Sequence, residues 1–434
     1  MQITASYKQH PIGFLNGNPL TEAIQPIQSH DVLTEKLTQK PRFDQSLWDL
    51  SEAHQQVLLQ QLYKTHIPVP QLVSLYNKCI GLILDGYAKF SPFSADTQRL
   101  QMKVATAALE GEEVDFEKVS RTTAPTVLID GHSGIGKTLG IRSVLKVIPQ
   151  VIEHHSYGDK LFKQKQLVWV SFDLPSTNSA KALALNFFQA VDEALGTDYY
   201  EEWKNKTNTS VERYFGQMRV IAVNHHLGLV HIDEMQFLLS YNANAKQETP
   251  SFSKIESLFN KFGIPILLSM TTAGKEILLA RNDKDDFTLA RRLLSDTSFT
   301  FKLHKANSQF FETLFNVLFQ PELCTEQHRP SQLFKLKFHD LSAGLPSMMI
   351  RLAFLHHEAI AIKRARKPEK ADMFQTDDYK ALIKVYNRQF NGLKDALESL
   401  KAGNHKDFEK NNAKADSEAE VTFSNEETKE PRYA

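Results

Sequence analysis

The sequence has few of the features that mark a secreted or membrane protein. Two cysteines, Cys79 and Cys324, occur in 434 residues, which excludes a disulfide framework and a cysteine-based metal site and favours a reducing compartment. No run of about 18 apolar residues is present, so the sequence predicts no membrane span. The first residues also lack the apolar stretch of a signal peptide. We therefore expect a cytoplasmic protein.

An excess of charge of either sign is missing as well. Lys plus Arg and Asp plus Glu number 51 each. Composition therefore argues neither for nor against a nucleic-acid partner, and a polyanion would have to bind a local basic patch.

Metal-ligand clusters are also scarce, although histidines occur in adjacent pairs that begin at His154, His225 and His356. Adjacent side chains of a strand or helix point in different directions. No cysteine or carboxylate cluster accompanies the pairs, so they do not predict a metal site.

One stretch, from Thr126 to Ile148, has a specific pattern. A short apolar run leads into a glycine-rich turn that fits G-x-x-x-x-G-K-[ST], and an amphipathic segment follows. Backbone N–H groups of such a turn and the positive end of the next helix surround a phosphate chain. The pattern predicts binding of ATP with Mg2+, with Lys137 at the β- and γ-phosphates and the Thr138 hydroxyl on the metal. The expected nucleotide contacts are Gly131, Ser133, Gly134, Ile135, Gly136, Lys137, Thr138 and Leu139.

Two acidic residues, Asp233 and Glu234, end an apolar run that lies 96 positions after Lys137. Asp233 is expected to bind Mg2+, directly or through water, and Glu234 to polarise the attacking water, as in-line phosphoryl transfer requires. The alternative is the acidic first turn of a helix. The apolar run and the spacing favour the catalytic interpretation.

Polar residues also follow the next apolar run. Thr271 or Thr272 would lie near the γ-phosphate and orient the lytic water, or would cap the following helix. Further along, Arg291 and Arg292 suit a finger that neutralises transition-state charge from a neighbouring subunit. A surface arginine pair at a helix end is the alternative.

The chain between Thr126 and Leu303 alternates apolar runs with helical patterns. This alternation predicts an α/β fold, a parallel sheet covered by helices. Ligands of such sheets bind at the carboxyl ends of the strands. The expected strands fall within 127–129, 167–174, 227–234, 263–272 and 299–303, the last at the far edge of the sheet.

Four regions are expected along the chain. Residues 1–120 would form an extended arm (1–44) and a helical region for partner contact, with helices over 46–66, 71–90 and 96–109. The nucleotide-binding core would span 121–305, and a helical lid 306–400. The polar tail, 401–434, would be disordered.

A further group of candidate residues, all basic, could contact DNA. Lys181, Lys204, Lys206 and Arg213 would face a phosphate backbone in the pore of a ring, and a basic run at 363–367 is a second candidate. Lysines on loops are more often simply solvated.

Several stretches resemble the TnsC/TniB family, AAA+ ATPases that regulate transposition in Tn7-like bacterial transposons. The resemblance includes "NGNPLTEAI" (16–24), "IPQVIEHHSY" (148–157), "QLVWVSFDLP" (166–175), "SAKALALNFFQAVDEALGTDYY" (179–200) and "HHLGLVHIDEMQFL" (225–238). It extends in patches over residues 10–360, and 148–200 is its most discriminating part.

The resemblance implies ATP-dependent assembly of rings or filaments on double-stranded DNA. The homo-oligomer would recruit transposase subunits and contact a target-selection protein of the TniQ type. One departure concerns the lid, where many AAA+ proteins place an arginine that contacts the γ-phosphate. Ser347 stands at that position and Arg351 follows a turn later, so the residue that acts as the second sensor is left unassigned.

Two alternative functions are an AAA+ module of signalling or replication type that acts on protein partners, and an inactive nucleotide-bound scaffold.

Overall fold

The computed structural model describes residues 2–43, 47–110, 125–174, 179–206, 209–238, 264–280, 298–405 and 407–412. It divides into two compact units, which are described separately. The first comprises Met1–Lys36, Pro70–Gly131 and Lys137–Phe301, and the second comprises Leu37–Val69, His132–Gly136 and Lys302–Ala434.

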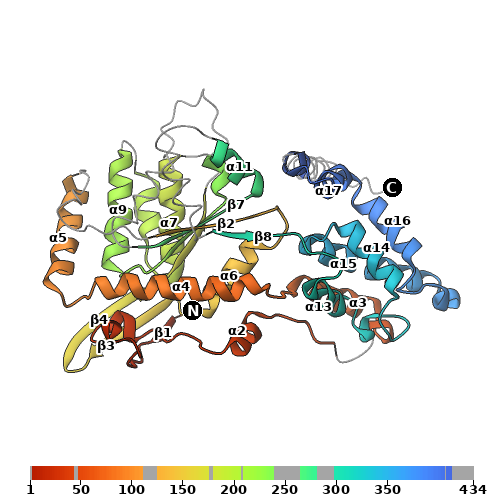
Figure 1. Ribbon diagram of the computed structural model, residues 1–434, viewed down its shortest axis with the longest axis horizontal. Helices are drawn as coiled ribbons and strands as arrows, with labels where there is room; N and C mark the ends of the chain where they lie inside the picture. The colour runs from red at the N-terminus through yellow and green to blue at the C-terminus, as the bar shows by residue number, and fades with distance from the viewer. Residues whose placement is uncertain are drawn as a thin grey trace, which may run out of the picture. The chain divides into compact units, whose positions relative to one another are not determined.

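The first unit is built on a parallel five-stranded sheet (Figure 1). Its strands are β2 (Thr126–Gly131), β5 (Val170–Asp173), β6 (Val230–Asp233), β7 (Ile266–Met270) and β8 (Ser298–Phe301), in the spatial order β5-β6-β7-β2-β8. All residues of β2, β6 and β7 are buried, which explains their unbroken apolar runs, since a parallel sheet is covered on both faces. The predicted α/β fold is confirmed, including β8 at the edge.

Helices cover this sheet. They are α4 (Pro70–Lys89), α5 (Ala95–Glu110), α6 (Lys137–Val147), α7 (Ala180–Leu195), α8 (Tyr199–Lys204), α9 (Val211–Asn224) and α11 (Thr272–Ala280). Helix α7 packs on β5, α9 on α7, and α5 on α9, as Figure 1 shows. The connection from β2 to β5 crosses the sheet in the direction opposite to that from β5 to β6, so right-handed crossovers place α6 on the face opposite α7 and α9.

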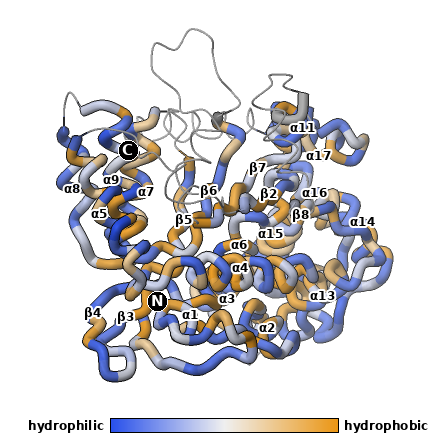
Figure 2. The backbone as a smooth tube through the Cα atoms, turned by 60° about the vertical axis from the view of Figure 1, so that its left-hand side comes forward, coloured by the Kyte–Doolittle hydropathy of each residue, from blue (hydrophilic) through white to orange (hydrophobic). Residues whose placement is uncertain are grey.

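A second sheet, which the sequence analysis did not predict, contains β1 (Gln2–Thr4), β3 (Val151–Tyr157) and β4 (Lys160–Leu167). Strand β1 pairs parallel with β3, and β3 pairs antiparallel with β4. Polar residues make β4 largely blue in Figure 2. The strand expected over 167–174 is therefore divided, because Leu167 ends β4 and Val170 begins β5.

The N-terminal residues pack into the first unit. Besides β1 they form η1 (Gly13–Leu15), α1 (Pro19–Glu22) and the start of α2 (His30–Leu37). Leu20 and Ile24 are each 1% exposed, and the Leu20 carbonyl accepts a hydrogen bond from Gln166 at 3.0 Å. The extended arm expected over residues 1–44 is instead packed over residues 2–36, because a few apolar side chains without periodicity are enough to anchor the segment.

The second unit is helical, as expected for 306–400. The single helix expected over 46–66 is replaced by η2 (Leu47–Asp49), α3 (Glu52–Gln60) and η3 (Gln61–Lys64). The later elements are α13 (Gln309–Leu318), η5 (Pro321–Leu323), α14 (Gln332–Ser342), α15 (Pro346–Arg366), η6 (Pro368–Met373), α16 (Tyr379–Gln389), η7 (Asn391–Leu393) and α17 (Lys394–Lys401). Stacked and edge-on rings of Phe315, Phe319, Phe334 and Phe338 form its core.

The chain remains folded past residue 401, where a turn follows α17. Residues 407–412 are helical, and Phe408 is 2% exposed. The prediction that disorder begins at residue 401 is therefore wrong, since one aromatic side chain in a polar segment is buried. Residues 413–434 lie outside the described residues. Among the helices that the structure describes, none is long and apolar enough to cross a membrane.

Candidate nucleotide-binding site

The glycine-rich turn connects the end of β2 to the start of α6. Gly134 and Gly136 have φ angles of +77° and +93°, a region that side-chain-bearing residues rarely adopt. Both glycines are thus needed for the backbone to make this turn. The last two residues of the motif, Lys137 and Thr138, are the first two residues of α6.

Two side chains of the motif make defined contacts within the first unit. The Lys137 ammonium group donates to the carbonyl oxygen of Gly131 at 2.7 Å. The Thr138 hydroxyl donates to Oδ2 of Asp233 at 2.6 Å. The fold thus brings together two residues that the sequence analysis assigned to one metal ion, although they lie on α6 and β6.

Asp233 ends a chain of polar side chains that crosses three neighbouring strands. The Ser269 hydroxyl donates to Asp233, and Nε2 of His231 lies 3.0 Å from the Ser269 oxygen. Because that hydroxyl hydrogen is used, Nε2 must donate, and Nδ1 accepts from Ser171 at 2.8 Å. Burial lowers the pKa of His231 to about 4, which keeps the imidazole neutral in this role.

These contacts hold Asp233 in its ionised form. Burial acts to raise its pKa, but the hydrogen bonds from Ser269, Thr138 and the Glu234 N–H outweigh burial, and the pKa lies below its ordinary value. A carboxylate and a hydroxyl are hard oxygen ligands of the kind Mg2+ prefers, and Mg2+ sites usually include few protein ligands besides substrate phosphates. The pair therefore fits Mg2+. No group of three or more His, Cys, Asp or Glu with metal-ligand geometry occurs among the described residues.

Glu234 lies in a different setting from its neighbour. It turns the chain out of β6 with a φ of +60°, and η4 (Met235–Leu238) follows. Burial, and then the charge of Asp233, raise the pKa of Glu234. Its carboxylate accepts a hydrogen bond from the side-chain amide of Gln236.

The end of β7 carries the two predicted sensor threonines. Thr271 caps α11, since its hydroxyl accepts from the Gly274 N–H at 3.1 Å, and its own N–H donates to Gln236 at 3.3 Å. The capping alternative is thereby confirmed for Thr271. Thr272 is the first residue of α11, and its sensor role stays a prediction.

Sequence reasoning missed a buried ion pair near the carboxyl end of β2. Asp130, on β2 and 1% exposed, accepts from the Lys275 ammonium group at 2.6 Å and from the Thr300 hydroxyl at 2.8 Å. The three residues join β2, α11 and β8. No spacing rule connects them, so only the position of Asp130 one residue before the motif could have drawn attention to it.

Loop residues 132–136 make their own contacts within the second unit. Ser347 N–H donates to the Gly134 carbonyl at 3.3 Å, and a Cβ at Gly134 would come within 2.4 Å of the Ser347 hydroxyl oxygen. The Ser133 N–H donates to the Glu409 carboxylate at 3.1 Å. Arg351, the alternative second sensor, lies over the Phe390 ring at 5.2 Å.

The remaining candidates are the two predicted finger arginines and the four basic residues expected to contact DNA. Arg291 and Arg292 lie outside the described residues. Lys181 and Arg213 are exposed in the first turns of α7 and α9. Lys204 forms an ion pair with Glu201 at 2.6 Å, and Lys206 lies 3.6 Å from the centre of the Trp203 ring.

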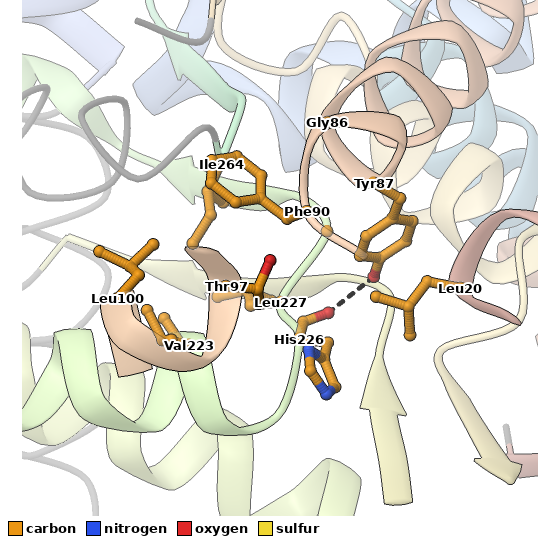
Figure 3. A pocket seen from close by; sticks show the side chains of 12 residues that line it. Leu20, Gly86, Tyr87, Phe90, Thr97, Leu100, Val223, His226, Leu227 and Ile264 are labelled. Carbon is orange, nitrogen blue, oxygen red and sulfur yellow. Dashed lines mark hydrogen bonds between the residues drawn. The ribbon is translucent and has the colours of Figure 1, made fainter. Parts of the chain in front are cut away.

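An apolar pocket elsewhere in the first unit does not provide a second ligand site. It is lined by Leu20, Tyr87, Phe90, Leu100 and Val223 among others, and the Tyr87 hydroxyl closes one side by donating to the His226 carbonyl at 2.7 Å (Figure 3). Its volume is about 40 Å³, far below the roughly 300 Å³ or more of ordinary small-molecule sites.

Comparison with known proteins identifies part of the chain. Residues 120–278 match the family model described as AAA domain, and they include the glycine-rich turn, Asp233, Glu234 and Thr271. The first unit is therefore an α/β P-loop fold of AAA+ type. No curated protein matches the sequence.

The solved structures to which the chain is similar are remote. A Walker-type ATPase of Pyrococcus abyssi is 12% identical, with 68% of this chain and 78% of that chain covered and a TM-score of 0.35. The ORC2 protein of Aeropyrum pernix in ADPNP–ADP complexes is 12% identical, with 72% and 77% covered and a TM-score of 0.37. Drosophila ORC bound to DNA is 10% identical, with 72% and 69% covered and a TM-score of 0.33.

Proposed function

We propose that this protein is an AAA+ ATPase that hydrolyses ATP to ADP and phosphate. The observation that carries the proposal is the 2.6 Å hydrogen bond between Thr138 and Asp233. This bond joins the last residue of the glycine-rich motif to the carboxyl end of β6. Nucleotide binds and reacts at this edge of such sheets.

Each residue has a role that its surroundings favour. Lys137 would leave the Gly131 carbonyl for the β- and γ-phosphates, and Thr138 and Asp233 would hold Mg2+. When bound, Mg2+ neutralises charge that develops on the phosphates. Glu234, half-buried and at the end of the same strand, would accept a proton from the attacking water. Arg291 or Arg292 of a neighbouring protomer would complete the site.

The test is turnover by Glu234→Gln. Because the amide has nearly the shape of the carboxylate but is not a base, we expect nucleotide binding within about two-fold of wild type and a loss of turnover of about 100-fold or more. Binding is measured with a fluorescent ATP analogue and turnover by phosphate release. Unchanged turnover would remove Glu234 from its role.

We further propose that the ATPase assembles on duplex DNA and regulates transposition, linking a TniQ-type target-selection protein to transposase subunits. The support is the TnsC-like sequence of residues 148–200, which spans β3, β4, β5 and α7. Exposed Lys181 and Arg213, in the first turns of adjacent helices, are available to phosphates. Hydrolysis would serve disassembly.

Assembly is tested by negative-stain microscopy of the full chain with an ATP analogue and duplex DNA. Rings or filaments that require both components support the proposal. Bound ATP analogue without any assembly would contradict it. Turnover that rises with a protein partner but not with duplex DNA would favour the alternative, an AAA+ module of signalling or replication type.

A further inference from the structure

Gln236 connects two groups that the proposed reaction uses. This residue lies in η4, two positions after Glu234. Its Nε2 donates to Oε2 of Glu234, and its Oε1 accepts from the main-chain N–H of Thr271 at 3.3 Å. A single side chain therefore joins the carboxylate after β6 to the end of β7.

Only one orientation of the Gln236 amide satisfies both neighbours. A carboxylate accepts hydrogen bonds and a main-chain N–H donates them. Turning the amide over would place its oxygen against the Glu234 carboxylate and its NH2 group against the Thr271 N–H. Both contacts would then be repulsive, so the amide fixes the direction in which the Glu234 carboxylate is held.

The first turn of α11 confines the Gln236 side chain. A Cβ placed on Gly274 would lie 2.8 Å from the Gln236 Cβ and 3.3 Å from the Thr271 hydroxyl oxygen. The glycine thus allows α11 to approach closely, and the same helix is capped by Thr271. Gln236 is packed between the helix start and Glu234 rather than extended into solvent.

Glu234 needs such a partner because of where it lies. The carboxylate is half-buried beside the ionised Asp233, and the backbone at Glu234 is in the left-handed region. Burial and a neighbouring negative charge both disfavour a second negative charge. A donor from Gln236 favours the ionised form and one side-chain orientation.

We propose that Gln236 is a positioning residue that couples the Glu234 carboxylate to the end of β7 at Thr271. A γ-phosphate would lie at that strand end. A change in the position of the Thr271 main chain would then shift the Glu234 carboxylate through the Gln236 side-chain amide. The inference rests on the proposed hydrolysis of ATP and adds to it the residue that orients the base.

The experiment compares Gln236→Ala with wild type in phosphate release, nucleotide binding and thermal unfolding. We expect kcat to fall by about 10- to 100-fold, as when a supporting residue of a catalytic group is lost, with KM and nucleotide affinity within about two-fold. Gln189→Ala is the matched control, because Gln189 donates to Glu193 at 3.1 Å on the exposed face of α7. The control should turn over like wild type.

A double variant distinguishes positioning from a general structural effect. If Gln236 acts through Glu234, Gln236→Ala should cause no further loss in a Glu234→Gln background, because residues that act as a unit are not additive. Additive losses would contradict the role of Gln236 and leave the proposed ATPase function intact. A wild-type kcat for Gln236→Ala while Glu234→Gln is inactive would do the same. Normal turnover by Glu234→Gln would instead contradict the proposed function, and the inference with it.

Discussion

Two regions of the molecule bury histidine equally and use it differently. At the carboxyl edge of the five-stranded sheet, His231 joins Ser171 to Ser269, and the chain of hydrogen bonds ends on Asp233. In the second unit His356 and His357 donate to the main-chain carbonyls of Thr376 and Leu318 at 2.7 and 2.9 Å. All three rings are 0% exposed, so burial does not distinguish a functional region from a structural one.

Charge does not distinguish them either. Burial lowers the pKa of His231 to about 4, of His356 to about 3 and of His357 to about 4. Each ring is therefore neutral at pH 7 and donates one hydrogen bond. The difference lies in what accepts it. His356 and His357 donate to main-chain carbonyls and so anchor helix packing. His231 donates to the Ser269 hydroxyl, which in turn donates a hydrogen bond to Asp233 and orients a carboxylate that can bind a metal.

The largest effect is expected for Asp233→Asn, which removes the charge at the end of the chain. The amide can no longer accept from all of Ser269, Thr138 and the Glu234 N–H as the carboxylate does. We expect a loss of turnover of about 100-fold or more, since ionic transition-state stabilisation is lost. Phosphate release over a range of Mg2+ concentrations measures it, and a wild-type rate at high Mg2+ would contradict this assignment.

A smaller loss is expected for His231→Phe, which keeps the ring volume but breaks the link between Ser171 and Ser269. Residues that support a metal ligand typically contribute about 10- to 100-fold in activity. His356→Phe is the matched control, expected to lower the melting temperature while leaving kcat near wild type. Equal effects of both changes on kcat would remove the contrast between the two regions.

The pH dependence of stability provides a third comparison. The pKa of a solvent-exposed histidine is about 6.5, and burial lowers the pKa of His356 in the folded chain to about 3. Between these values the unfolded state binds more protons, so the free energy of unfolding falls as pH falls below about 6.5. His356→Gln keeps an N–H donor without titrating, and should remove about 2 kcal/mol of the loss between pH 7 and pH 5. Urea unfolding at the two pH values measures this, and an identical loss in both proteins would contradict it.

The smallest effects concern the two adjacent threonines at the end of β7. Thr271→Ala removes the cap of α11 and should lower the free energy of unfolding by about 1 kcal/mol. Thr272→Ala, within the first turn of that helix, should change it by less than about 0.5 kcal/mol. Urea titration of both variants tests the difference, and the reverse order would contradict the observed capping.

Local sequence pattern predicted part of the fold and of the candidate site, whereas the contacts between residues distant in sequence could not be predicted. Glycine spacing and apolar runs predicted the parallel sheet, the glycine-rich turn and the Asp233–Glu234 strand end, because these depend on local pattern. The β3–β4 hairpin was missed because β4 lacks the polar–apolar alternation of a half-buried strand: residues 163–166 are an unbroken run of lysine and glutamine. His231, Ser269, Gln236 and Lys275 were missed because their roles arise only when strands distant in sequence become neighbours.

Hydrolysis is tested most directly by phosphate release from Mg-ATP by the full chain, measured side by side with Lys137→Ala. We expect turnover by the wild type and none above background by the variant, because the ammonium group that would reach the β- and γ-phosphates is gone. Turnover absent from the wild type, or equal in the two proteins, would contradict the claim that this edge of the sheet hydrolyses ATP.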